Sequence, residues 1–369
     1  MKRLTLLAGI ATVAAVTHHA SQWVLTAMFW WADRYRDTSI PDFSLVGKAP
    51  FVGVRLVELA TVAGVPAFLF ISGNFAAFAM RSTPGGQPWK AVLARIRYLF
   101  PPYLLWSTVM LTIRWLDGQP LGGWNVIRLL LTGGAAAPYY YVPLLIQLYA
   151  ISPFLVAWIT RRWQLVLGAA VSLSFMISVL RTIFLVSPGL LPEESPWLGG
   201  LLNAPLAAYS VWFVVGIIAG THSAGFKRIL SIGPRSWLAL TAVLGGMAIV
   251  EWEIVRRLAG RQWFSAGITL FDNLFLIALL LLFLSLAKSP DALQRPLGQV
   301  GSHAYGIYLS HVPILEVIAR GLYHFAPRML GQPLLLYFVL VLGGIGLPLG
   351  VMGLLRASPF RRVYAYAFG

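Results

Sequence analysis

Runs of about twenty predominantly apolar residues recur along the whole of this 369-residue chain. A helix of that length can cross the hydrocarbon core of a bilayer, which is about 30 Å thick. The composition agrees, because 58% of the residues are hydrophobic and only 11% are charged, whereas soluble domains carry roughly 25% charged residues. No hydrophilic block is long enough to be a soluble domain. The sequence therefore predicts an all-α, polytopic membrane helix bundle that forms a single domain over residues 1–369.

We expect about ten membrane-spanning helices from the positions of the apolar runs. They are residues 4–28, 52–80, 95–116, 142–160, 163–185, 206–220, 237–250, 267–287, 304–320 and 334–355. The first run follows Met1, Lys2 and Arg3, as in a signal peptide. It is too long for such a peptide and no small-residue cleavage motif follows it, so we interpret it as a retained helix.

Basic residues gather in the loops on the amino-terminal side of the predicted bundle. They are Lys2, Arg3, Arg81, Lys90, Arg95, Arg97, Arg161, Arg162, Lys227, Arg228, Arg235, Lys288, Arg295, Arg356, Arg361 and Arg362, with Asp291 the one acid among them. The opposite loops mix both signs, for example Asp33, Arg34, Arg36 and Asp37, then Glu193 and Glu194. Cytoplasmic loops of membrane proteins are rich in lysine and arginine, so both termini are predicted to be cytoplasmic. The same bias accounts for the net charge of +16, which is therefore no indication of nucleic-acid binding.

Two adjacent histidines, His18 and His19, lie in the outer part of the first span. Ionisable side chains are costly in hydrocarbon, and those that occur there usually face a protein interior or a polar cavity. The rise of an α-helix places His18 and Glu58 of the second span at a similar depth, where a carboxylate would orient a catalytic imidazole. Alternatively, Glu58 pairs with Arg55, three residues before it. His19 points about 100° away from His18, and we expect it to pack or to form a hydrogen bond.

Other polar residues inside predicted spans are candidates to line an internal cavity. Ser72 follows a glycine and a proline that weaken the second span, although close helix packing through Ser72 and Gly73 is an alternative. The ninth span carries Tyr308 and His311, and the fourth carries Gln147. Further candidates are Arg114, Asp272, Asn273 and Glu316. These residues are typical of either a membrane enzyme or a transporter.

The sequence contains no metal-binding or thiol motif. His18 and His19 are adjacent, whereas helical metal ligands are spaced by three or four residues. The chain has no cysteine, which excludes disulfides and thiolate catalysis. We therefore expect neither a metal ion nor a covalent cysteine intermediate.

A series of motifs along the chain resembles a known family. The motifs are Thr17-His18, Val65-Pro66-Ala67-Phe68-Leu69-Phe70-Ile71-Ser72-Gly73, Arg95 and Arg97 before Pro101-Pro102-Tyr103, Tyr141 to Pro153 with Gln147, Phe213-Val214-Val215-Gly216, and Ser302 to His311 with Tyr305 and Tyr308. In this order, and over nearly the whole chain, they resemble the acyltransferase type 3 family of bacterial integral-membrane acyltransferases. The members that modify cell-surface polysaccharides are the most similar.

This resemblance implies a reaction and assigns residues to it. An acyl group, often acetyl, would pass from a cytoplasmic acyl-coenzyme A to a hydroxyl of a surface glycan or glycolipid at the bacterial inner membrane. His18 matches the family's first-span histidine, for which a catalytic acid–base or acyl-relay role is implied. Arg95 or Arg97 matches an arginine that would contact the donor phosphates, which suits the forked guanidinium. The family usually places another arginine before the histidine, at the position that Leu7 occupies here.

A second function uses the same features without acyl chemistry. An exporter or flippase of a glycan or lipid-linked precursor would also need polar groups within the membrane and broken helices. No internal repeat is visible in the sequence to support it. In either case the expected partners are membrane lipid and a glycan or glycolipid, and the sequence does not indicate an oligomeric state.

Overall fold

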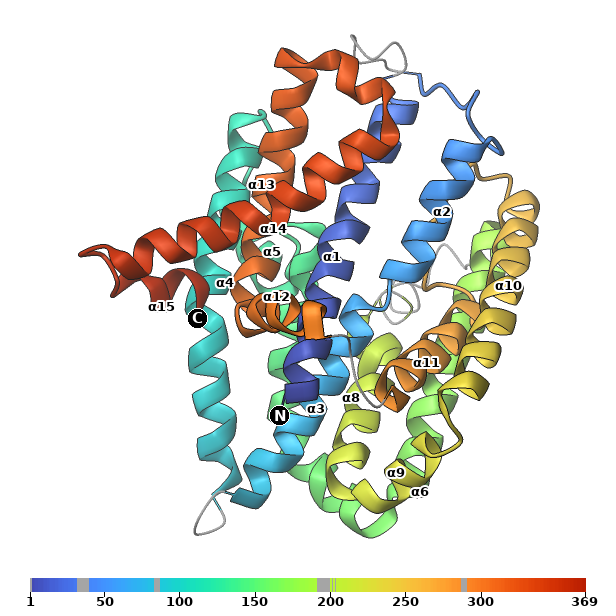
Figure 1. The fold of residues 1–369 in the computed structure, drawn as a ribbon, viewed down its shortest axis with the longest axis vertical. Helices are drawn as coiled ribbons and strands as arrows, with labels where there is room; N and C mark the ends of the chain where they lie inside the picture. Colours follow the sequence, from blue (N-terminus) through green and yellow to red (C-terminus); the bar gives the residue numbers. More distant parts are fainter. Residues whose placement is uncertain are drawn as a thin grey trace. The chain divides into compact units, whose positions relative to one another are not determined.

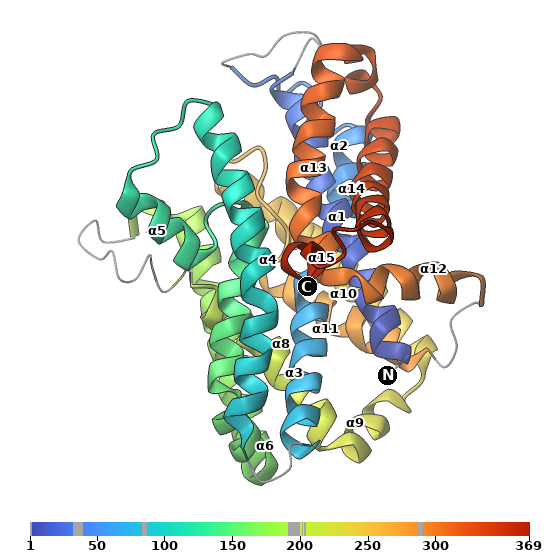
Figure 2. The same ribbon diagram turned by 90° about the vertical axis from the view of Figure 1, so that its left-hand side faces the viewer.

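In the computed structural model the protein is described for residues 2–31, 40–82, 87–190, 200, 202, 204–286 and 291–369. Every regular element within these ranges is a helix (Figures 1 and 2), which confirms the predicted all-α class for this part of the chain. The expected loop charges Asp33, Arg34, Arg36, Asp37, Glu193, Glu194 and Lys288 lie outside the described residues. The helices form two compact units.

The first unit consists of residues 1–64, 95–143 and 294–369. Its elements are α1 (Lys2–Phe29), α2 (Ala49–Thr61), most of α4 (Pro88–Leu116), α5 (Gly123–Thr132), η2 (Ala137–Tyr140), most of α12 (Asp291–Ser302), α13 (Ala304–Phe325), η4 (Pro327–Gly331), α14 (Pro333–Ala357) and α15 (Val363–Phe368). Helix α1 packs against α2, α13 and α14. The hydrophobic core of this unit includes Val16 of α1, Ile307, Met352 and Phe368. Because α1 contacts three other helices and contributes to this core, it is the central helix of the unit.

The second unit consists of residues 65–94 and 144–293. Its elements are α3 (Gly64–Ser82), nearly all of α6 (Tyr141–Val186), η3 (Pro188–Leu190), α8 (Pro205–Thr221), α9 (Ser223–Leu230), α10 (Pro234–Leu258) and α11 (Leu270–Ser285). Helices α10 and α11 pack side by side. The Glu251 carboxylate accepts hydrogen bonds from the amides of Leu270 and Phe271 at 3.3 and 2.7 Å. These amides have no helical partner at the start of α11, so Glu251 caps that helix.

Small residues set the contact between α3 and α8. A Cβ atom on Gly73 would overlap the main-chain carbonyl of Phe213, and a Cβ atom on Gly216 would overlap that of Phe70. The two backbones are therefore in direct contact, as in membrane helix pairs built on small residues. The alternative that Ser72 and Gly73 mark close helix packing is confirmed, and the Phe213–Gly216 motif has the same explanation.

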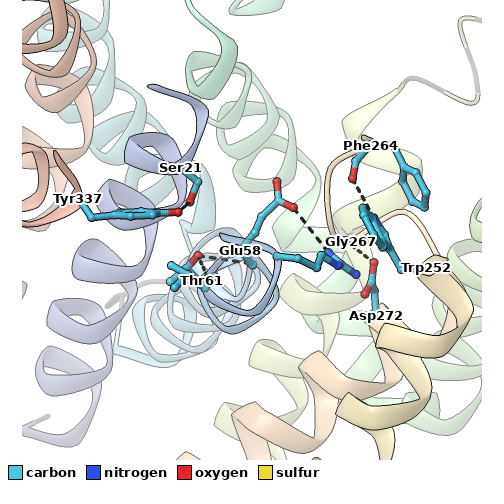
Figure 3. A network of polar contacts seen from close by, with 10 residues as sticks. Ser21, Glu58, Thr61, Trp252, Phe264, Gly267, Asp272 and Tyr337 are labelled. Carbon is cyan, nitrogen blue, oxygen red and sulfur yellow. Dashed lines mark hydrogen bonds and ion pairs between the residues drawn. The ribbon is translucent and has the colours of Figure 1, made fainter. Parts of the chain in front are cut away.

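Other buried polar residues of the second unit also have structural partners. The Asp272 carboxylate accepts a hydrogen bond from the Gly267 amide at 2.8 Å, as Figure 3 shows. The Asn273 amide group donates to Ser178 Oγ at 3.2 Å and to the Thr269 carbonyl at 2.8 Å. Asp272 and Asn273 therefore stabilise the beginning of α11.

Among the described residues, five helices are long and apolar enough to cross a membrane, or six if the bent pair α8–α9 counts as one span. That pair is bent by 106°. The second predicted span is divided between α2 and α3, which separate at residues 62–63. The fourth and fifth predicted spans are both in α6, which departs from helical geometry at Arg162 (φ −143°, ψ 50°). A multi-pass membrane protein is thus supported, while ten spans remain a prediction.

Candidate active site

Three histidine side chains from two helices meet in the first unit. His18 and His19 are adjacent on α1, with ring centroids 5.4 Å apart. The ring of His311, on α13, lies 5.3 Å from that of His19 and is tilted by 35° to it. Tyr308, one turn earlier on α13, lies 5.9 Å from His311. The structure therefore brings together three predicted site residues, His18, Tyr308 and His311. The ring of His19 lies between those of His18 and His311. We refer to His18, His19 and His311 as the histidine cluster.

Pro313 explains why the part of α13 around Leu309 is held by hydrogen bonds to η2. Proline has no amide hydrogen, so the carbonyl of Leu309, four residues before it, lacks its helical partner. The buried hydroxyl of Tyr139 donates to this carbonyl at 2.6 Å. The Tyr308 hydroxyl donates in the opposite direction, to the carbonyl of Pro138. These two hydrogen bonds join η2 to α13 at the residues two and three positions before His311, and Tyr308 therefore acts here as an anchor.

The hydrogen bond of His311 defines which ring nitrogen carries the proton. Nδ1 lies 3.1 Å from the carbonyl of Ile307 on the preceding turn of α13. Because a carbonyl oxygen can only accept, the hydrogen of the neutral ring is on Nδ1. Nε2 then has a lone pair, and it has no hydrogen-bond partner among the described residues. His311 is fully buried, so Nε2 is a hydrogen-bond acceptor held in the protein interior.

His19 is exposed to a cavity of about 340 Å³ in the first unit. Residues of α1, α4, η2, α13 and the turn after α4 line it: His19, Gln22, Trp23, Thr26, Met110, Arg114, Asp117, Gln119, Ala136, Ala137, Pro138, Val312, Leu315, Glu316 and Arg320. Amide and hydroxyl side chains, an indole ring and charged groups thus share one space. A cavity of this size and mixed lining is typical of a small-molecule site.

A network of charges joins α4 to α13 along one wall of this cavity. Arg320 donates two hydrogen bonds to the Asp117 carboxylate, at 2.9 and 2.6 Å. Its guanidinium also lies 2.7 Å from the Glu316 carboxylate. A guanidinium fork on a carboxylate has a fixed geometry, so the network fixes the position of α13 relative to the end of α4. Arg114 lines the same cavity.

His18 and Glu58 are in contact, as predicted, but the contact is with the main chain of Glu58 and not with its carboxylate. The His18 imidazole contacts the backbone carbonyl of Glu58 on α2. The Glu58 carboxylate lies 3.6 Å from the guanidinium of Arg55, and both side chains are buried. The pairing of Arg55 with Glu58 is thereby confirmed. Figure 3 shows Glu58 on α2 and, on the neighbouring helices, Tyr337 donating to Ser21 Oγ at 2.6 Å.

Arg95 and Arg97 lie far along α4 from the cavity. Both side chains are exposed. Met110 of the cavity wall is thirteen positions after Arg97, which corresponds to about 20 Å along a helix axis. The structure therefore does not bring the two arginines into the histidine cluster.

Ser72 and Gln147 belong to the second unit. Ser72 is buried on α3 beside the close contact with α8, whereas Gln147 is exposed on α6. In the same motif as Gln147, Pro153 deprives the carbonyl of Tyr149 of its helical partner, and Ser152 Oγ donates to that carbonyl at 2.6 Å. Ser152 thus replaces the amide hydrogen that Pro153 lacks, so these two residues of the motif have a structural role.

Residues that line the cavity follow a helical spacing that is visible in the sequence. His19, Gln22, Trp23 and Thr26 recur at intervals of three and four, and so face one side of α1. The spacing alone does not distinguish the two histidines, because Ser21 and Gln22 are three and four residues after His18; the cavity lining, which includes His19 and not His18, does. By contrast, the ion pair of Asp117 with Arg320 joins residues far apart in the chain, and nothing in the sequence predicts it.

Comparison with known proteins identifies the family. The sequence profile of acyltransferase family 3, described as an acyltransferase domain, matches residues 1–353. Searches of curated proteins and of solved structures gave no match. Among the described residues, no group of three histidine, cysteine, aspartate or glutamate side chains is placed to hold a metal ion. The profile covers nearly the whole chain, and the protein therefore belongs to acyltransferase family 3 and is an acyltransferase.

Proposed function

We propose that this protein transfers an acyl group, specifically acetyl, from a cytoplasmic acyl-coenzyme A to a hydroxyl of a surface glycan or glycolipid. The observation that carries this proposal is the histidine cluster beside a cavity in an acyltransferase. Gln22, Thr26 and Gln119 offer hydrogen bonds to a hydroxyl-rich acceptor, and Trp23 offers an apolar surface to its ring. This combination suits a sugar.

The reaction needs a base close to the acceptor hydroxyl. As the hydroxyl oxygen attacks the acyl carbon, a new C–O bond forms and the C–S bond to coenzyme A breaks. The proton of the hydroxyl passes to an imidazole of the cluster, which then protonates the departing thiolate. General base catalysis of this kind contributes about 10²–10⁴-fold to the rate. The resemblance to the family assigns this role to His18, and the similar depth of Glu58 is the reason to propose it as the partner of His18.

The donor phosphates are proposed to bind at the start of α4. Arg95 and Arg97 are exposed cations, and arginine forms bidentate hydrogen bonds with phosphate. Positions two apart on a helix do not face the same side, so Arg95 and Arg97 cannot both contact the same phosphate from one face of α4. The acyl arm of a donor held there must extend along α4 to reach the histidines.

The proposed orientation of the chain in the membrane is consistent with separate binding sites for the donor and the acceptor. We propose ten spans in the bacterial inner membrane with both termini cytoplasmic, because basic residues gather in the loops of that side. Arg95 and Arg97 then lie near the cytoplasm, and the cavity, built on the later part of α1, lies toward the outside. Donor and acceptor would reach the histidines from opposite faces of the membrane.

Purified protein tests the proposal directly. It is incubated in detergent with [¹⁴C]acetyl-coenzyme A and the surface-glycan fraction of a strain that lacks the protein. We expect free coenzyme A to appear, with label in the glycan, only when protein and glycan are both present. Absence of release and of labelling would refute acetyl transfer. Glycan movement into proteoliposomes without thiol release would instead indicate the exporter.

A further inference from the structure

The two histidines of α1 have different surroundings. His19 lines the cavity together with Gln22 and Thr26, which lie on the same face of the helix. His18 does not line it and contacts the main-chain carbonyl of Glu58 instead. An acceptor hydroxyl bound in the cavity would therefore meet His19 before any other histidine.

A second histidine stands behind His19. The Nδ1 hydrogen of His311 is held by the Ile307 carbonyl, so Nε2 is left as an acceptor. Of the two rings in contact with His311, that of Tyr308 has its hydroxyl bound to the Pro138 carbonyl. The other ring is that of His19. His19 is thus the neighbouring ring with an N–H to offer.

The separation of the two rings suits such a hydrogen bond. Two imidazoles joined by one N–H···N hydrogen bond of about 2.9 Å have centroids roughly 5 Å apart, and the observed separation is 5.3 Å. No hydrogen bond reaches His311 Nε2 from the described residues in the present arrangement. A rotation of the His19 ring that brings one of its N–H groups to this atom would relieve a buried, unpaired acceptor, which is energetically costly.

We infer that His19 is the base that takes the proton of the acceptor hydroxyl, and that His311 is the positioning residue that holds the opposite nitrogen of His19. This inference rests on the proposed acyl transfer and assigns its proton. The N–H of neutral His19 then points to His311 Nε2, so its other nitrogen is free to take the proton, and the hydrogen bond to His311 strengthens when His19 becomes an imidazolium in the transition state. The orientation by a third group follows the logic of a catalytic triad, in which the imidazole is held in one tautomer.

Variants of the three histidines test this assignment in the purified acetyl-transfer reaction with [¹⁴C]acetyl-coenzyme A and the glycan fraction. His19→Ala and the bulkier His19→Gln are both expected to lower kcat by about 10²–10⁴-fold. His18→Ala is expected to lower it by less than about tenfold, and His303→Ala, at a half-buried histidine that does not line the cavity, is the matched control. Size-exclusion elution and thermal unfolding show whether each variant is folded.

His311 requires readouts that a structural role would not change. His311→Leu removes the acceptor and is expected to lower kcat by roughly 10–100-fold, the loss of one hydrogen bond to a charged group. The KM for the donor should stay constant, and the acidic limb of the pH–rate profile should move. His311→Gln keeps a donor for Ile307 and an acceptor for His19, so it should recover part of the activity. The groups around His19 whose charge could affect this profile are His18 on α1, Arg114 on α4, Asp117 directly after it, and Glu316 and Arg320 on α13.

The outcomes separate this inference from the proposed function. An inactive wild-type protein would refute the acyl transfer itself. With an active wild type, full activity of folded His19→Gln would overturn the assignment to His19, and so would a loss in His18→Ala as large as that in His19→Ala. Equal activities of His311→Leu and wild type, with the same pH profile, would overturn the role of His311.

Discussion

The pairing of Tyr139 with the carbonyl freed by Pro313 makes a quantitative prediction. The Tyr139 side chain and Leu309 are both fully buried, and their hydrogen bond is 2.6 Å long. Tyr139→Phe removes the donor and leaves the Leu309 carbonyl without one in the protein interior. A buried polar group in that situation costs about 1–3 kcal/mol, so the free energy of unfolding should fall by that amount.

A second substitution separates this cause from a general packing defect. In Pro313→Ala, the new amide hydrogen can bond to the Leu309 carbonyl as in an ordinary helix. Tyr139→Phe should then destabilise the protein far less, by under about 0.5 kcal/mol, and the cycle of single and double variants should give a coupling energy of about 1–2 kcal/mol.

Unfolding of the four proteins can be followed by circular dichroism in detergent with increasing sodium dodecyl sulfate. Equal destabilisation by Tyr139→Phe in both backgrounds would refute the reasoning, because the hydroxyl would then not be replacing the missing amide hydrogen. His311 follows Leu309 on the same helix turn, so the acetyl-transfer rate of Tyr139→Phe also reports on how far this anchor positions the histidine.

Three further predictions concern packing, donor binding and orientation. Gly73→Ala should lower the thermal unfolding temperature, because overpacking costs about 1–3 kcal/mol. The control Gly246→Ala, where a Cβ atom meets no neighbour within 4 Å, should leave this temperature unchanged or raise it. Equal shifts in the two variants would contradict the close packing of α3. Arg95→Ala and Arg97→Ala should raise the KM for acetyl-coenzyme A by unequal factors, since the two side chains face different sides of α4, and unchanged values in both would exclude them from the donor site. A reporter fused after Gly369 should be active only in its cytoplasmic form, and an external reporter would overturn the proposed topology.

The sequence predicts the helices well where the apolar runs are long and bounded by charge. The pair Arg161 and Arg162 separates two predicted spans, and the backbone leaves helical geometry at Arg162. Short helices are not predicted, since α9, α12 and α15 have no long apolar run to reveal them. Their formation depends on contacts with other helices, such as the hydrogen bond from Trp106 to the carbonyl of Ala367 at the end of the chain.

The candidate site is predicted only in part. Helical rise brings His18 to the level of Glu58, as the structure confirms, but depth does not determine which atoms meet. The motif that includes His311 is visible in the sequence, yet its proximity to His19 arises from the packing of α1 against α13. The depth of Glu58 and the family motif favour His18 in the sequence, whereas only the structure shows that His19 is the one that lines the cavity.

Mass analysis of surface glycans tests the central claim most directly. Glycans are compared from a strain that lacks the protein and from the same strain carrying either the wild type or His19→Gln at equal membrane levels. We predict acetyl esters that disappear without the protein, return with the wild type and stay absent with His19→Gln. Glycans with the same ester content in all three strains would contradict the account.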